Sequence, residues 1–188
     1  MKRILWLTLS VLLALAACTR QNPDSGLEEE GDDYITLHYV KWARQPVTCR
    51  LGGAEESAPA GFSAPTADQL KKLISVESKY YGSYKGIKGV LFSARDINGF
   101  VPAIVADDGR VHDADYNRYT FTDEHLAHAV FLPVNDGWDG YYWGNCDGVH
   151  YNSMHFSMTE MKTGSVVFGG GTGARLFTLE GGMLPVKD

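Results

Sequence analysis

The chain has 188 residues, of which 44% are hydrophobic and 21% charged, a composition typical of a folded globular protein and not of a disordered one. Its formal net charge of -6 argues against binding nucleic acid through phosphate contacts. Much of this charge lies in residues 19–33, where six acidic side chains stand against Arg20 alone.

Residues 1–17 have the pattern of an export signal. Lys2 and Arg3 precede an apolar run over residues 4–17, which is too short to cross a bilayer comfortably as a permanent helix. The run ends in Leu-Ala-Ala before Cys18, and this tetrad resembles the bacterial lipoprotein box, in which the cysteine is acylated and becomes the mature N-terminus. We therefore predict a lipoprotein signal peptide over 1–17 and a fatty acyl group such as palmitate on Cys18. The alternatives are a conventional signal peptide or a short membrane anchor.

Residues 18–33 comprise the acylated cysteine and an acidic spacer. Leu27 is the only large apolar side chain in the spacer, so this stretch buries too little surface to fold, and we expect a flexible tether. The acidic run resembles the export signals of surface lipoproteins in the Bacteroidetes, although a plain hydrophilic linker would have the same composition. We expect a cell-envelope protein that is lipid-anchored to the outer membrane, with the acidic run favouring exposure at the cell surface.

The remaining residues, 34–188, are expected to form a single α+β domain. Alternation of apolar and polar residues predicts a half-buried strand from Tyr34 to Tyr39. Residues 52–64 are rich in Gly, Ala, Ser and Pro and are expected to form a loop.

The clearest helix signal follows this loop. Thr66 and Gln69 have the spacing of a capping box, in which each side chain satisfies an orphan backbone N–H of the other residue. Apolar residues then recur at helical spacing, and the same spacing places Glu77 on the side that faces water. We expect the helix to fade by Tyr80.

Short apolar segments separated by turn residues make up the rest of the domain. A second helix is predicted over 123–129, capped by Thr122 and with Phe121 packing onto Leu126. We predict strands at 89–94, 100–106, 129–133, 154–158, 165–168 and 174–179, and turns at 98–99, 107–109 and 162–164. The expected fold is thus two helices with short, mostly antiparallel strands and long irregular loops.

Two cysteines, Cys49 and Cys146, remain besides the acylated one. An exported compartment permits a disulfide between them, which would contribute about 4–5 kcal/mol in the chain-entropy model. Alternatively, the two thiols are separate and packed as small hydrophobic side chains. Both alternatives stay open, because a sequence gives no distances.

Three segments resemble a known family, over about residues 60–188. They are Gly61–Thr66 with the helix after it (G-W-R-L-P-T-x-x-E-W in the family), Phe131–Pro133 with Gly140–Trp143 (F-L-P…G-x-Y-W), and Gly164 through Gly173 to Leu176 (G…G-x-x-V-R-C/L). The family is the Fibrobacter succinogenes major paralogous domain, related in fold to the formylglycine-generating enzyme and to C-type lectin-like domains. The chain departs from the family's entry motif at Phe62, Ser63 and Gln69-Leu70, which replace its Trp, Arg and Glu-Trp.

The resemblance implies a C-type lectin-like fold and a domain that works at the cell surface or outside the cell. Formylglycine-generating enzymes use two active-site cysteines, one of them near the final strand. The matching stretch here, Ala174–Leu176, has no thiol, which argues against that oxidase chemistry. We therefore expect no catalytic residues and no enzyme activity.

Candidate metal ligands are few. His125 and His128 lie three apart on the second predicted helix, but no third ligand has a suitable spacing, and a solvated helix face is the favoured explanation. Residues 169–173 (GGGTG) lack the Lys-Ser/Thr of a phosphate-binding loop and are expected to be a turn or a connection. Oxygen ligands for Ca²⁺ are offered by Asn135, Asp136 and Asp139, although any tight loop needs the same residue types.

A ligand is expected to bind in an irregular region over 135–151, because loops carry most recognition. Trp138 is the strongest candidate, since Gly137 and Asp139 beside it predict a loop tip, whereas Trp143 is expected in the core. Aromatic faces stack on sugar rings or apolar protein groups, and carboxylates fix orientation. The candidate ligand-binding residues are Asp136, Trp138, Asp139, Tyr141, Tyr142, His150 and Tyr151.

The sequence thus predicts a surface-tethered lipoprotein with a non-enzymatic binding or adhesion domain for a glycan or a surface protein. It would contact the membrane through its N-terminal lipid and would need no cofactor other than the Ca²⁺ considered above. One alternative is a structural subunit or tip component of a cell-surface assembly, which would present an exposed edge strand or groove. The other is an enzyme, which would need a buried cluster of titratable groups with perturbed pKa values.

Overall fold

The computed structural model describes residues 31–50, 52–148, 150–167 and 180–188. Within these ranges strands predominate and three helices accompany them, so the predicted α+β class is confirmed. The strand expected at 174–179 lies outside the described residues, as do Cys18 and the signal peptide. No helix in the described ranges is long and apolar enough to cross a membrane.

The first and last strands of the domain meet in one small antiparallel sheet. Its strand order is β1 (Tyr34–Leu37), β2 (Val40–Ala43), β15 (Val186–Lys187) and β4 (Phe62–Ser63). The strand predicted from Tyr34 is confirmed as far as Leu37. Tyr39 does not belong to it and is 59% exposed in the β1–β2 turn, where His38 and Tyr39 both have positive φ, as a type I′ turn requires.

A second sheet contains the strands that follow the main helix. Its order is β10 (Ala129–Pro133), β6 (Ile87–Ser93), β5 (Ser78–Tyr84) and β9 (Tyr119–Phe121), with β9 parallel to β5 and the other pairs antiparallel. The predicted strands at 89–94 and 129–133 are confirmed in β6 and β10. Of the strand predicted at 100–106, only Ile104–Val105 forms a strand, β7, which pairs with β8 (Val111–His112). Phe100 stacks instead on Tyr119, with ring centroids 4.2 Å apart.

The third sheet is the largest. Its order is β13 (Met161–Val167), β12 (His150–Phe156), β11 (Gly140–Asp147), β14 (Glu180–Met183) and β3 (Val47–Arg50), with β14 parallel to β11. The turn expected at 162–164 is wrong, because these residues pair in continuous register with β12. The strand expected at 154–158 begins earlier, at His150, and ends at Phe156.

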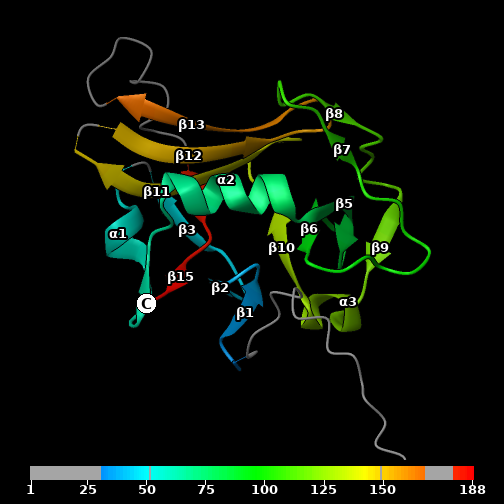
Figure 1. Cartoon of the computed structure of the whole chain (residues 1–188), viewed down its shortest axis with the longest axis horizontal. Coiled ribbons are helices and arrows are strands. Elements are labelled where there is room, and N and C mark those ends of the chain that lie inside the picture. Colours follow the sequence, from blue (N-terminus) through cyan, green and yellow to red (C-terminus); the bar gives the residue numbers. More distant parts are fainter. Residues whose placement is uncertain (1–30, 51, 149, 168–179) are drawn as a thin grey trace, which may run out of the picture.

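The main helix, α2 (Ala67–Val76), lies across β11–β13 in Figure 1. Its capping box is confirmed: Thr66 Oγ1 accepts from the backbone N–H of Gln69, and Gln69 Oε1 accepts from that of Thr66, at 3.3 and 2.8 Å. The helix ends before Glu77 and not near Tyr80, because the following residues pair with β6 as β5. Glu77 is not on the water-facing side either: it is 2% exposed, and its carboxylate lies 2.5 Å from His38 Nδ1.

Two shorter helices complete the domain. The predicted second helix is confirmed as α3 (Asp123–Ala127), with a capping box between Thr122 and His125, and Leu126 packs against the apolar cluster that contains Phe121. The predicted loop at 52–64 contains α1 (Ala54–Ser57) as well as β4.

Apolar side chains cover both faces of the third sheet. Tyr142 belongs to the large cluster beneath α2, together with Leu70 and Phe156, whereas Trp143 belongs to a second cluster with Cys49. Neighbouring residues of β11 point to opposite faces, so a sheet with two covered faces buries both of these aromatic side chains. The prediction that Trp143 is a core residue is confirmed, at 2% exposed.

Candidate functional site

Trp138 occupies the tip of a tight hairpin turn between β10 and β11. Asp136 and Asp139 exchange both backbone hydrogen bonds, at 3.0 and 2.9 Å, which leaves Gly137 and Trp138 as the two turn residues. Gly137 has a φ of 62°, the value that the first position of a type II′ turn needs and that glycine adopts without strain. The prediction of a loop tip at Trp138 is confirmed, and its side chain is 51% exposed.

Two neighbours hold the Trp138 side chain and its backbone. The Lys88 ammonium lies 3.5 Å from the centroid of the indole ring, a cation–π contact, and has no carboxylate partner among the described residues. Tyr116 stacks beside the indole, with centroids 6.3 Å apart, and its hydroxyl donates to the Trp138 carbonyl at 3.1 Å. The turn is therefore fixed from inside while the indole remains half in water.

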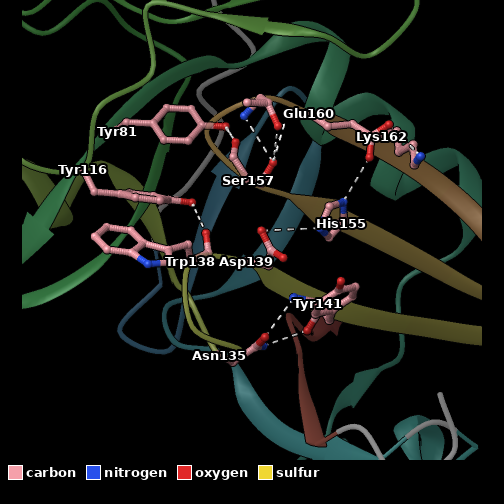
Figure 2. Close-up of polar contacts among 11 residues, drawn as sticks. Tyr81, Tyr116, Asn135, Trp138, Asp139, Tyr141, His155, Ser157, Glu160 and Lys162 are labelled. Carbon is pink, nitrogen blue, oxygen red and sulfur yellow. Dashed lines mark hydrogen bonds and ion pairs between the residues drawn. The ribbon is translucent and has the colours of Figure 1, made fainter. Parts of the chain in front are cut away.

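A buried pair of tyrosines packs against the turn and lies above Trp138 in Figure 2. The rings of Tyr116 and Tyr81 lie 5.2 Å apart, and the Tyr81 hydroxyl donates to the Ser157 carbonyl at 2.7 Å. Burial raises the pKa of both tyrosines, and the charge of Asp139 raises that of Tyr116 further. Both hydroxyls consequently stay protonated and act as hydrogen-bond donors at neutral pH.

His155 on β12 lies between two carboxylates beside the turn, as Figure 2 shows. Its Nδ1 is 3.5 Å from Glu160, and its Nε2 is 3.9 Å from Asp139, too far for a hydrogen bond, so that this buried nitrogen has no partner. The Tyr141 ring packs on the imidazole at 4.7 Å, and burial followed by the charge of Asp139 raises the pKa of Tyr141. This cluster extends the polar surface from the turn across the start of β11.

The arrangement is suited to binding. An exposed indole on a rigid turn, with the exposed carboxylate of Asp136 and the partly exposed one of Asp139 beside it, offers a flat apolar face next to hydrogen-bond acceptors. Lys88 adds a donor at the ring face. We refer to Trp138, Asp136, Asp139, Tyr141 and Lys88 as the Trp138 surface.

The structure separates the predicted ligand-binding residues. The irregular region expected over 135–151 is wrong, because most of it is the β11–β12 hairpin. His150 and Tyr151 lie at the other end of this hairpin, about 25 Å along β11 from Trp138 at the usual rise of about 3.4 Å per residue. Tyr142 is 1% exposed, and its hydroxyl donates to the Pro133 carbonyl at 2.7 Å, so it is a core residue and not a ligand contact.

Of the proposed Ca²⁺ ligands, Asn135 has its side-chain amide engaged within the protein. The Asn135 side-chain amide bonds both the N–H and the carbonyl of Tyr141, at 2.9 and 2.8 Å, and so holds the start of β11. In the part of the chain that the structure describes, no group of three or more His, Cys, Asp and Glu side chains is arranged to hold a metal ion. His125 serves as the capping partner of Thr122.

Cys49 and Cys146 are free thiols in the structure, which therefore contains no disulfide between them. Cys49, on β3 at the edge of the third sheet, is buried in the same cluster as Trp143, and burial raises its pKa to about 11. Cys146 is exposed, not packed in the core, and its thiol donates to the Gly148 carbonyl at 3.1 Å.

Three residues of this region were not found from the sequence: Lys88, Tyr116 and His155. Tyr116 comes from the chain between β8 and β9, and Lys88 from β6, both remote from Trp138 in the sequence. Only His155 had a signal in the sequence. Met154 and Phe156 alternate as apolar residues, and this alternation places His155 on the opposite face of the strand.

The chain matches no family model, no curated protein and no solved structure in comparisons of all three kinds.

Proposed function

We propose that this protein is a lipid-anchored binding protein of the bacterial cell envelope, whose domain recognises a glycan through the Trp138 surface without catalysing a reaction. The observation that carries this proposal is the half-exposed indole on a turn that two backbone hydrogen bonds and one from the Tyr116 hydroxyl hold in place. An exposed indole offers a flat face on which a sugar ring can stack, and neighbouring carboxylates suit the hydroxyl groups of a sugar.

The finer fold assignment belongs to the same proposal. We assign the domain to the C-type lectin-like group and to the Fibrobacter major paralogous domain family. Support comes from the antiparallel pairing of β15 with β2, which joins the start and the end of the described domain, and from the first two matching segments, which contribute Leu70, Leu132 and Tyr142 to one core. Phe131 and Gly140, which lie in the second of these segments, flank the Trp138 turn.

The site is tested with Trp138→Ala, with Tyr39→Ala as a matched control. Tyr39 is another exposed aromatic residue in a two-residue hairpin turn, and it lies outside the Trp138 surface. On an array of bacterial and host glycans we expect the unmodified protein and Tyr39→Ala to bind the same sugars, and Trp138→Ala to lose that binding. A screen without any bound glycan, or equal binding by all three proteins, would contradict the proposal.

A stability measurement decides whether Trp138 instead serves to cover the core. About half of the roughly 200–250 Å² of a Trp side chain is already in water, so truncation removes at most about 3 kcal/mol of burial at about 25 cal/mol per Å². Trp143→Ala removes a fully buried indole and should cost about 3–5 kcal/mol. If Trp138→Ala loses as much unfolding free energy as Trp143→Ala, Trp138 is a core residue and the proposed binding site is wrong.

The lipid anchor is tested separately. Cys18→Ser should abolish metabolic labelling of the protein by fatty acids, because it removes the acylated thiol, and once the signal peptide is cleaved the protein should be released from membranes, because residues 19–33 have no apolar segment to hold it there. Unchanged labelling of the variant would exclude Cys18 as the acylated residue.

A further inference from the structure

A cavity of about 450 Å³ lies between α2, the β7–β8 hairpin and β13, away from the Trp138 surface. In Figure 1 the β7–β8 hairpin and β13 lie near the end of α2 that leads into β5. Ile74, Val105 and Met161 supply apolar wall, and Lys79 is one of the polar residues that line the cavity. The volume is in the range of small-molecule sites.

Lys79 is the unusual member of this lining. It is the second residue of β5, and the alternation of that strand places it on the same face as Tyr81, beneath α2. The residue is only 8% exposed, and its ammonium, which still reaches water, has neither a hydrogen bond nor an ion pair with any described residue. Burial of most of the side chain lowers the pKa of Lys79, even though the charge of Glu77 opposes this effect.

The other charged residues at the cavity are largely matched. Lys162 pairs with Glu160 at 2.6 Å, Lys71 with Asp68 at 3.8 Å, and Asp108 with Arg110 at 2.6 Å. Asp107 is exposed and forms no ion pair with Lys79. The carboxylate of Glu77 is bound to His38. Among the described residues that line the cavity, Lys79 is thus a largely buried lysine whose ammonium forms no ion pair.

We propose that this cavity binds a small organic molecule through one singly charged anionic group, a carboxylate or a sulfate ester, which pairs with the Lys79 ammonium. One cation without an ion pair calls for one negative charge, and a charge-assisted hydrogen bond is about twice as strong as one between neutral groups. The apolar wall formed by Ile74, Val105 and Met161 takes the carbon skeleton of the ligand. This site contains no residue of the Trp138 surface, so a test of one proposal does not decide the other.

The proposal is tested by titrating the isotope-labelled protein with three probes and following the backbone amide signals of Ala106 and Gly109. The probes are glucuronate, which carries a carboxylate, methyl sulfate, which carries a sulfate ester, and inorganic phosphate at a pH where it is mainly a dianion; sodium chloride at equal ionic strength is the baseline. Lys79→Met keeps the length of the side chain and removes its charge. Lys85→Met, at an exposed lysine at the other end of β5, is the matched control.

We expect saturable shifts with glucuronate or methyl sulfate, at least about tenfold weaker binding in Lys79→Met, and unchanged binding in Lys85→Met. Which of the two probes binds more tightly assigns the ligand to the carboxylate or the sulfate class. Lys79→Met should remain folded, since it replaces a buried charge by an apolar group, and its unliganded spectrum verifies this. No saturation with either monoanion, tighter binding of phosphate, or equal binding by a folded Lys79→Met would overturn the proposal.

Discussion

Gly140 offers a direct test of how the base of the Trp138 turn is packed. It is the first residue of β11 and pairs with Phe156, whose ring lies over it. A methyl group at residue 140 would be 2.6 Å from Cε2 of this ring and closer still to Cζ, whereas carbon atoms pack at about 3.5–4.0 Å. The ring cannot move aside easily, because it is fully buried and stacks on Tyr142 at 5.8 Å.

Gly140→Ala should therefore destabilise the protein by overpacking. The typical cost of overpacking is about 1–3 kcal/mol, and the rigid surroundings of Phe156 place this site at about 2 kcal/mol or above. For a chain of this length, a loss of that size lowers Tm by about 4–8 °C. Gly164→Ala is the matched control: it lies in the same sheet, and its added methyl group would meet Ser153 Oγ at 3.6 Å, an ordinary contact.

Thermal and denaturant unfolding of the two variants measures the difference. We expect Gly164→Ala to be neutral or slightly stabilising, because alanine loses less backbone entropy than glycine on folding. If Gly140→Ala is within about 0.5 kcal/mol of the unmodified protein, or if both variants lose the same stability, the explanation of Gly140 by close packing under Phe156 is wrong.

Two further predictions concern the buried groups. In the native protein Cys146 should react with a thiol reagent and Cys49 should react only after unfolding, as mass mapping would show; a bridge between them in the exported protein would contradict the free thiols of the structure. Burial raises the pKa of Glu77 above its usual value of 4.5, so the folded state holds this proton to higher pH than the unfolded chain, and stability falls as the pH rises from about 4.5 through the folded-state pKa. Glu77→Gln should remove this loss, and an identical dependence of unfolding free energy on pH in both proteins would count against it.

Local signals in the sequence were sufficient for elements whose ends are fixed by local contacts. The capping boxes at Thr66 and Thr122 predicted the starts of α2 and α3, since the side chain and the amide that it satisfies are only three residues apart. The apolar run at 129–133 matches β10 at both ends, because Pro133 and the Asx-Gly turn after it terminate the strand.

Elements fixed by long-range pairing were predicted less well. Lys162–Gly164 has the composition of a turn, yet β12 supplies a complete partner for it, and pairing overrides the local preference. Glu77 follows the helical spacing of α2, but the pairing of β5 with β6 ends the helix one residue before it and turns the carboxylate toward His38. No pattern within α2 itself indicates that β6 will pair with the residues after it or that His38 will lie beside Glu77.

In the candidate site, too, features fixed by local contacts were predicted and features fixed by long-range contacts were not. Gly137 and Asp139 identify the Trp138 turn because a two-residue hairpin is a local structure. Tyr142 was misassigned because a local pattern cannot tell whether the second face of a strand is covered, and here two separate clusters cover both faces of β11. Tyr116 and Lys88 reach Trp138 only through the tertiary fold.

The way in which Trp138 is held bears on how strongly it can bind. Its backbone is fixed by the Asp136–Asp139 pair and by the Tyr116 hydroxyl before any ligand arrives. Ordering a loop and its side chains on binding usually costs part of the interaction energy, and this cost is already met in the folded protein. The indole rotates about only two side-chain bonds and is limited further by Tyr116, so Lys88 is the one side chain of the ring contact that has to move when a ligand covers that face. A site of this kind gains affinity from preorganisation and not from area. Because the indole is half in water, Trp138→Ala should cost less stability than Trp143→Ala, while it removes the whole aromatic face that a ligand would contact.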